Sequence, residues 1–321
     1  MINPAALQRI KRLGTFPILF GAEVVLCRKK PKQRPRFLEL RKRFPAILES
    51  LSHGDISSFV TPLWSHFNQQ ASIALLPYPP FDFLRDDVVS HNMVVDARGS
   101  WLRTQRRFVE EQVDPQQLGP LLIEDCVGMP RLAIARYLTS HTMVHHLYHF
   151  LKFQQATNVD VAVVGTVVDW GGGYGNQAKI FKRLNPDATY FVIDTPLFSA
   201  MQWLYLSSVL GEEEVTIATD PSLILQGKIN LVPLGALKNL ELSADLFVST
   251  WALSESSRYS QDHVVGSQWF GARHLLLAFQ EGYEQEGLSL PDAGRVGIAA
   301  AEAGAEVTSI PFLPGNHYAF S

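Results

Sequence analysis

Hydrophobic and polar residues follow two different patterns along the chain, and the change between them falls near residue 160. Before it, helices are predicted over residues 36–51, 105–111 and 131–155, among stretches rich in proline, arginine, histidine and aromatic residues. After it, short apolar runs alternate with helical or loop segments. The predicted strands are residues 161–169, 190–194, 229–234, 245–250 and 273–280. Such alternation predicts a parallel sheet with helices on both faces.

The last part of the chain predicts a hairpin. Residues 307–312 and 317–321 are separated by the turn sequence Leu313-Pro314-Gly315-Asn316. We therefore expect a short antiparallel hairpin after the parallel strands. The change of pattern divides the chain into a mainly helical region, residues 1–157, and an α/β domain, residues 158–321.

A glycine-rich junction follows the first predicted strand and precedes a helix predicted over residues 177–184. It reads Val167-Val168-Asp169-Trp170-Gly171-Gly172-Gly173-Tyr174-Gly175. Glycines at such a turn allow the backbone to approach a ligand closely. Asp194 ends the next predicted strand, where a carboxylate can accept both hydroxyls of a ribose. The junction and Asp194 together predict a cofactor site.

Two classes of cofactor fit this junction. Gly173-x-Gly175-x-x-Ala178 satisfies the dinucleotide fingerprint, which predicts an oxidoreductase that binds NAD(P) or a flavin. The spacing Asp169-x-Gly171-x-Gly173-x-Gly175 instead resembles motif I of the class I S-adenosylmethionine-dependent methyltransferases. We favour the second interpretation, because an aspartate and a tryptophan separate the strand from the first glycine. A methyltransferase-like scaffold in glycan assembly, without catalysis, is a third hypothesis.

Several motifs, read together, resemble the bacterial sugar O-methyltransferase family. They lie at residues 168–175, 192–196, 245–250 with Glu255 downstream, and 314–317, so that the resemblance extends over residues 160–321. It implies a class I methyltransferase with a Rossmann-like, seven-stranded sheet of five parallel strands and a C-terminal antiparallel hairpin. It also implies transfer of a methyl group from S-adenosylmethionine to a hydroxyl of a surface glycan, a nucleotide-sugar or a glycosylated metabolite.

The resemblance also assigns the cofactor-binding residues. Residues 158–321 would bind S-adenosylmethionine, and residues 1–157 would cap the substrate site. The methionine moiety would be framed by Asp169, Gly171, Gly173 and Gly175, the ribose by Asp194, with Thr195 near the ribose or adenine. Thr250 ends the fourth strand at the edge of the sheet where ligands sit. Trp170, Asn176 and Gln177 depart from the family's pattern, which has smaller or aliphatic residues there.

A sugar hydroxyl is a poor nucleophile near neutral pH, so we expect a general base near the methyl group. His141, His145 and His149 recur at helical spacing with His146 beside them, and Glu255 follows the fourth strand in a polar loop. The candidate bases are therefore His145, His146 and Glu255. No metal site is predicted, because no carboxylate or cysteine motif accompanies the histidines.

Charge and cysteine content limit the partners of the 321-residue chain. A net charge of −3 gives no reason to expect nucleic acid, and two cysteines indicate reduced thiols in a cytoplasmic protein. The apolar run at residues 13–27 is too short to span a bilayer and contains Glu23. Nine of the 28 Lys and Arg residues follow it within residues 28–43. This segment is either solvated or makes peripheral contact with an anionic membrane.

Overall fold

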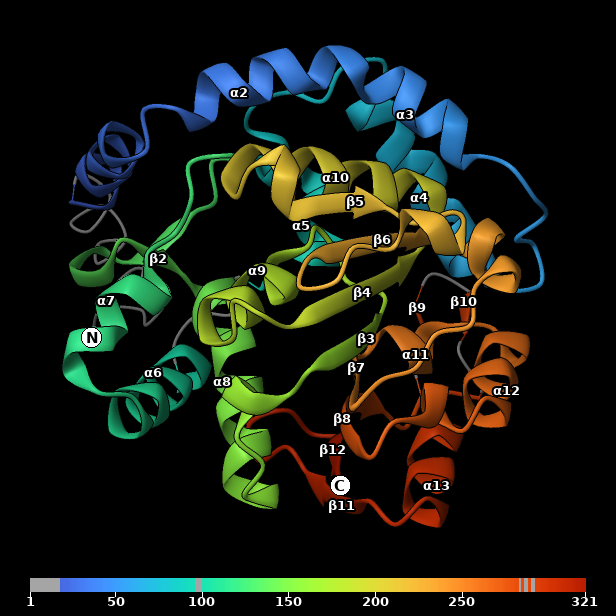
Figure 1. The fold of residues 1–321 in the computed structure, drawn as a ribbon. Helices are drawn as coiled ribbons and strands as arrows, with labels where there is room; N and C mark the ends of the chain where they lie inside the picture. Colours follow the sequence, from blue (N-terminus) through green and yellow to red (C-terminus); the bar gives the residue numbers. More distant parts are fainter. Residues whose placement is uncertain (1–17, 96–99, 283, 286–287, 290–291) are drawn as a thin grey trace.

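A single eight-stranded sheet forms the centre of the computed structural model, which describes residues 18–95, 100–282, 284–285, 288–289 and 292–321 (Figure 1). In chain order its strands are β3 (Thr166–Trp170), β4 (Thr189–Asp194), β5 (Val215–Ile217), β6 (Ile229–Pro233), β7 (Leu246–Thr250), β8 (His274–Gln280), β11 (Glu306–Ser309) and β12 (Asn316–Phe320). The order across the sheet is β5, β6, β4, β3, β7, β8, β12, β11. β12 pairs antiparallel with β8 and β11, and every other pairing in this sheet is parallel.

This topology confirms the predicted α/β fold, a Rossmann-like parallel sheet with a C-terminal antiparallel hairpin, and differs from the prediction in detail. The sheet has eight strands and not seven, because β5 adds a three-residue strand at the edge beside β6. The first predicted strand begins later than expected. Residues 161–163 form a 3₁₀ turn whose start is capped by the Asp160 side chain, and β3 begins at Thr166.

Helices cover both faces of the sheet because its strands bury alternate side chains on opposite sides. Val167 of β3 packs in a cluster with residues of α8 (His141–Thr157), α9 (Asn176–Leu184) and α10 (Pro196–Val209). The next residue, Val168, packs in a second cluster with residues of α12 (Arg258–Gly266) and α13 (Arg295–Glu302). The short α11 (Ala252–Glu255) follows β7 directly. Both faces of the sheet are therefore buried, as the predicted alternation requires.

The N-terminal part is mainly helical and packs against these layers. Its helices are residues 18–29, α2 (Gln33–Leu40), α3 (Phe44–Leu51), α4 (Pro62–Leu75), α5 (Asp87–Met93), α6 (Ser100–Gln112) and α7 (Pro115–Leu122). Helices α2 and α3 contact α10, and α6 contacts α8. Their apolar side chains belong to the same hydrophobic cluster as one face of the sheet.

All three helices predicted in this region have different limits in the structure, and the one predicted over residues 105–111 is the longer α6. The helix predicted over residues 36–51 is divided into α2 and α3 by a 3₁₀ turn at Arg41–Arg43. The helix predicted over residues 131–155 begins only at His141, because residues 132–140 include the short strands β1 (Leu132–Ile134) and β2 (Thr139–Ser140). The Ser140 hydroxyl accepts a hydrogen bond from the Met143 N–H and so fixes the start of α8.

Two further strands, β9 (Glu284–Gln285) and β10 (Leu288–Ser289), form a separate antiparallel pair. Across the ranges described above, none of the helices has the length and apolar character that crossing a membrane requires.

Candidate functional site

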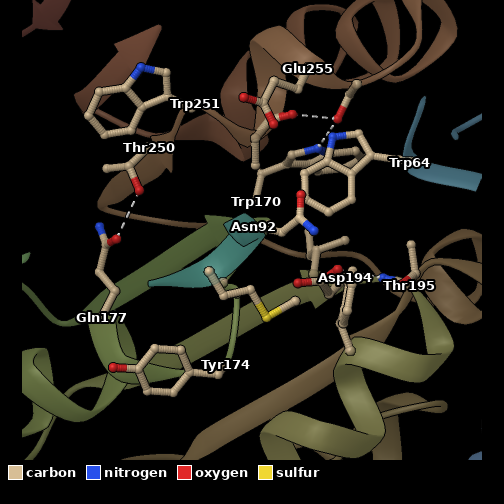
Figure 2. A pocket seen from close by; sticks show the side chains of 18 of the residues that line it. Trp64, Asn92, Trp170, Tyr174, Gln177, Asp194, Thr195, Thr250, Trp251 and Glu255 are labelled. Atoms are coloured by element: carbon tan, nitrogen blue, oxygen red, sulfur yellow. Dashed lines mark hydrogen bonds between the residues drawn. The ribbon is translucent and has the colours of Figure 1, made fainter. Parts of the chain in front are cut away.

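A cavity of about 300 Å³ opens at the carboxyl ends of β3, β4, β6 and β7 (Figure 2). Its floor is formed by Gly171–Gly173, Ile193–Thr195, Leu234 and the Thr250–Ala252 turn. Two N-terminal segments, residues 59–64 and 91–95, complete its walls. This volume is at the lower end of the range for small-molecule sites, and the edge is where parallel α/β sheets bind ligands.

The glycine loop requires glycine for two different reasons. Gly171 has a φ of +79°, and a Cβ there would lie 2.1 Å from the Ala252 Cβ. Gly173 has a φ of +57°, but a Cβ there would meet no atom within 4 Å. Gly171 is therefore constrained by packing, whereas Gly173 faces open space in the cavity. Gly175 begins α9 and does not line the cavity.

Asp194 ends β4 and connects the glycine loop to α10. Its Oδ1 accepts the Thr195 N–H at 2.8 Å, and its Oδ2 accepts Gln202 Nε2 at 2.8 Å. Burial raises the pKa of Asp194 to about 7, against the lowering effect of these hydrogen bonds and of those from the Gly172 and Gly173 backbone. Thr195 lines the cavity beside it and donates its hydroxyl to Asn68 of α4.

Asp169 is not among the residues that line the cavity, although it lies beside the glycine loop. Side chains alternate along β3, so Trp170 lines the cavity while Asp169 points toward β4. Its Oδ2 accepts the Tyr190 hydroxyl at 2.9 Å, and only 1% of the residue is exposed. Burial raises its pKa to about 7. Asp169 therefore supports the glycine loop from inside the protein, and its place at the methionine moiety stays a prediction.

Gln177, in the first turn of α9, lines the cavity and carries an unsatisfied amide donor. Its Oε1 accepts the Thr250 hydroxyl at 3.1 Å, whereas its buried Nε2 has no partner among the described residues. A buried amide N–H without an acceptor is costly, so a ligand acceptor at this position would stabilise the site. The only signal for Gln177 in the sequence is that it departs from the family's pattern.

His145 and His146 both line the cavity, but their ring nitrogens differ in availability. The Nδ1 of His145 lies 2.8 Å from Gln105 Nε2, and its Nε2 lies 3.0 Å from His149 Nε2. His149 in turn lies 2.8 Å from the Tyr318 hydroxyl. Burial lowers the pKa of His145 and His149 well below the usual range. With both nitrogens engaged, His145 presents its ring to the site and stacks on Trp251 at 5.6 Å.

His146 is better placed than His145 to contact a ligand. Its Nδ1 lies 3.0 Å from Asn176 Nδ2, and its Nε2 has no hydrogen bond to any residue that the structure describes. Burial, and secondarily the charge of Lys179, lowers its pKa to about 3. The ring is consequently neutral at pH 7, and one nitrogen remains for a ligand.

Glu255 lies on the other side of the cavity. Figure 2 shows it beside Trp64 and Trp170, across from Gln177 and Thr250. Burial raises its pKa to about 7, and a hydrogen bond with Trp64 opposes this shift. The structure therefore brings His145 and His146 to the end of the cavity near Gln177, and Glu255 to the opposite side. Within the described ranges, no group of three His, Cys, Asp or Glu side chains is arranged to hold a metal ion.

Other lining residues come from N-terminal segments that carry no motif. These are Phe59, Thr61, Trp64, His91, Asn92 and Met93. The loop before α4 reaches the sheet through the close approach of Gly54 and His53 to Gly235, where a Cβ would lie 2.2 Å from the His53 carbonyl oxygen. No local pattern indicates such a contact between segments about 180 residues apart in the sequence.

Comparison with known proteins gives only distant similarities. No family model matches the chain, and no curated protein matches it. Mitomycin 7-O-methyltransferase MmcR is 15% identical over 68% of this chain and 65% of its own, with a TM-score of 0.38. The pyocyanin biosynthetic protein PhzM is 15% identical over 99% of both chains, with a TM-score of 0.36. Fibrillarin from Aeropyrum pernix, solved with S-adenosyl-L-methionine, is 12% identical over 54% of this chain and 73% of its own, with a TM-score of 0.35. Similarity at this level assigns no function, which has to come from the cavity itself.

Proposed function

We propose that this protein is an S-adenosylmethionine-dependent O-methyltransferase. The observation that carries the proposal is the cavity with an unsatisfied amide donor, Gln177 Nε2, at one side and the Asp194 carboxylate at the other. The ligand expected there has an acceptor group at one end and hydroxyls in the middle. S-adenosylmethionine has a carboxylate and a ribose in these positions.

The described residues fit this cofactor. Gln177 Nε2 would donate to its carboxylate, Asp194 would accept from its ribose hydroxyls, and the open side of Gly173 leaves room for the chain between them. Ile193, Leu234 and Phe59 provide apolar walls for the adenine. A dinucleotide fits less well, because the cavity holds about 300 Å³ and none of the described residues that line it is Lys or Arg to meet a pyrophosphate.

The cofactor supplies a methyl group on a positively charged sulfur, which is already a strong electrophile. The protein has to align the acceptor hydroxyl with it and remove the hydroxyl's proton. The neutral His146 offers a free Nε2 for that proton on the side of the cavity near Gln177. Glu255 is the second candidate base, because an ionised carboxylate with a pKa near 7 can also accept a proton at neutral pH.

A sugar hydroxyl is the acceptor that we propose. Trp64, Trp170 and Trp251 give the cavity aromatic surfaces, which suit the C–H faces of sugar rings. Asn92 and Thr61 add polar groups for the remaining hydroxyls. The motifs that resemble sugar O-methyltransferases support the same assignment.

Calorimetric titration tests the cofactor assignment. S-adenosylhomocysteine should bind, NAD and NADP should not, and Asp194→Ala and Gln177→Leu should each weaken binding by about 1 to 3 kcal/mol. The exposed Asp187 provides a matched control, since Asp187→Ala should leave the affinity unchanged. Tighter binding of NAD than of S-adenosylhomocysteine would favour the oxidoreductase hypothesis instead.

The acceptor is tested separately by release of S-adenosylhomocysteine. The enzyme should be incubated with S-adenosylmethionine and either neutral glycosides, nucleotide-sugars or phenols. Turnover of a sugar-containing acceptor is expected. Turnover of phenols alone would refute the sugar assignment and leave the methyltransferase proposal intact.

A further inference from the structure

The helix formed by residues 18–29 has one face buried and one face unusually apolar for a surface. Ala22 and Leu26 are buried and pack with Leu132. Four other apolar side chains are exposed around the exposed Gly21: Phe20 (59%) and Val24 (39%) lie opposite the buried face, and Ile18 (62%) and Val25 (43%) lie beside it. A contiguous exposed apolar strip indicates a contact surface.

The part of the sequence that contains this helix is strongly basic. Residues 1–32 contain seven Lys and Arg residues and one acidic residue, in a chain whose net charge is −3. That acidic residue, Glu23, is paired with Arg85 at 2.8 Å. Arg28 and Lys29 are exposed at the end of the helix and form no ion pair with any residue that the structure describes.

The rest of the basic segment is largely engaged within the protein. Its contacts are Lys30 with Asp125, Arg34 with the Phe81 ring, Arg36 with the Ser208 carbonyl, Arg41 with the Pro79 carbonyl, Lys42 with Glu39, and Arg43 with Glu212 and the Trp203 ring. Apart from the exposed Lys32, the free cations of residues 28–43 are therefore Arg28 and Lys29 at the end of the apolar helix.

We propose that this helix docks the protein onto an anionic lipid bilayer. Phe20, Val24 and Val25 would enter the boundary between headgroups and acyl chains, while Arg28 and Lys29 contact the phosphates. Ala22 and Leu26 stay packed against Leu132 on the opposite side, so we expect the helix to lie in the membrane surface. Nucleic acid is the less suitable anionic partner, because it offers nothing to the apolar strip. The inference does not depend on methyl transfer.

Co-sedimentation of the full chain with vesicles tests the proposal. Vesicles of phosphatidylcholine with about one third phosphatidylglycerol should bind the protein, and pure phosphatidylcholine should bind it at least about tenfold more weakly. Arg28→Glu with Lys29→Glu should weaken binding to the anionic vesicles about thirtyfold or more, since each basic side chain near the surface contributes about 1 kcal/mol. Phe20→Ser with Val24→Ser should weaken it about tenfold or more, because less apolar surface enters the bilayer.

Ile298→Ser is the matched control, because Ile298 is 64% exposed on α13, far from the N-terminal helix in Figure 1. Ile298→Ser should bind the anionic vesicles as tightly as the unmodified protein does. All variants should unfold at the same temperature as the unmodified protein. The proposal fails if the protein does not bind anionic vesicles, or if the Phe20 and Val24 double variant binds them normally. A third outcome would also contradict the proposal: the protein does not bind vesicles but forms a concentration-dependent dimer, and the Phe20 and Val24 double variant abolishes that dimer. The apolar strip would then be the contact between two copies of the chain.

Discussion

Three carboxylates around the cavity, Asp169, Asp194 and Glu255, share a pKa raised to about 7 by burial. Their partners differ. Asp169 accepts a tyrosine hydroxyl inside the protein, Asp194 holds the glycine loop, and Glu255 meets Trp64. The same raised pKa therefore affects the stability of the fold at Asp169, whereas at Asp194 and Glu255, which line the cavity, it affects how the carboxylate can interact with a ligand.

Asp169→Asn should stabilise the protein at high pH. The folded-state pKa lies above the unfolded value of 3.8, so the contribution of Asp169 to stability is complete below about pH 4 and is lost as the pH rises through 7. Asparagine has the same size, can accept the Tyr190 hydroxyl and carries no charge. We expect the free energy of unfolding in urea to rise by about 1 to 4 kcal/mol at pH 8 and to change little at pH 4. Lower stability of the variant at pH 8 would contradict this account.

His146→Ala should abolish turnover while preserving the cofactor site. Loss of a general base typically costs about 10² to 10⁴ in rate, whereas the affinity for S-adenosylhomocysteine should stay within about twofold. Because the pKa of His146 is about 3, its protonation should produce no step in the rate between pH 5 and 9.

His145→Ala and Glu255→Gln are the comparisons, each measured with saturating cofactor and with and without a chelator. Loss of turnover in Glu255→Gln alone would transfer the role of base to Glu255. Loss on chelation would indicate a metal-dependent reaction instead.

At the scale of elements, the glycine loop joins strand, turn and helix in one unit. Gly171 contacts the turn after β7, and Gly173 faces the cavity. Substitution at the two positions should therefore separate folding from binding.

Gly171→Ala should destabilise the fold, because its Cβ collides with Ala252 and its backbone is left-handed. We expect a loss of about 2 kcal/mol or more in the free energy of unfolding. Gly173→Val should retain a folded protein and lose binding of S-adenosylhomocysteine, because the side chain fills ligand space. Circular dichroism and calorimetry distinguish the two effects. Normal binding by Gly173→Val would show that the loop does not contact the cofactor.

The sequence was sufficient to predict the elements whose burial produces a local pattern of apolar residues. The five predicted parallel strands appear in the sequence as apolar runs, and the glycine loop after β3 is marked by its glycines. By contrast, β5 has only three residues, and residues 132–140 contain no proline or glycine that would end a helix pattern. The walls contributed by Trp64 and Asn92 meet lining residues more than 50 positions away in the sequence, which no local pattern encodes.

At the scale of the whole molecule, a buried charge network joins the N-terminal region to the helix after the glycine loop. Lys179 of α9 is fully buried and lies 2.9 Å from Glu124 and 3.1 Å from Asp125. Burial alone would raise the pKa of Asp125, but the charges of Lys179, Arg183 and Lys30 outweigh it and lower that pKa strongly. The network adds a polar link to the hydrophobic cluster that the two regions share.

Lys179→Met should cost about 3 to 5 kcal/mol, because it leaves two carboxylates without their central cation. Adding Glu124→Gln should recover part of this loss. Urea unfolding measures both effects, and we expect a single transition, since the N-terminal helices and the sheet share one cluster. Two separate transitions would show instead that residues 1–157 and 158–321 fold independently.

The position of β12 between β8 and β11 has a consequence for biosynthesis. The edge strand β11 is translated before β12, yet all its pairing in the sheet is with β12. Until residues 316–320 have emerged from the ribosome, β8 exposes an unpaired edge and β11 has no strand to join. The nascent chain therefore passes through a stage in which the rest of the sheet can form while one flank remains open, and chaperones that recognise exposed strands would act at that stage.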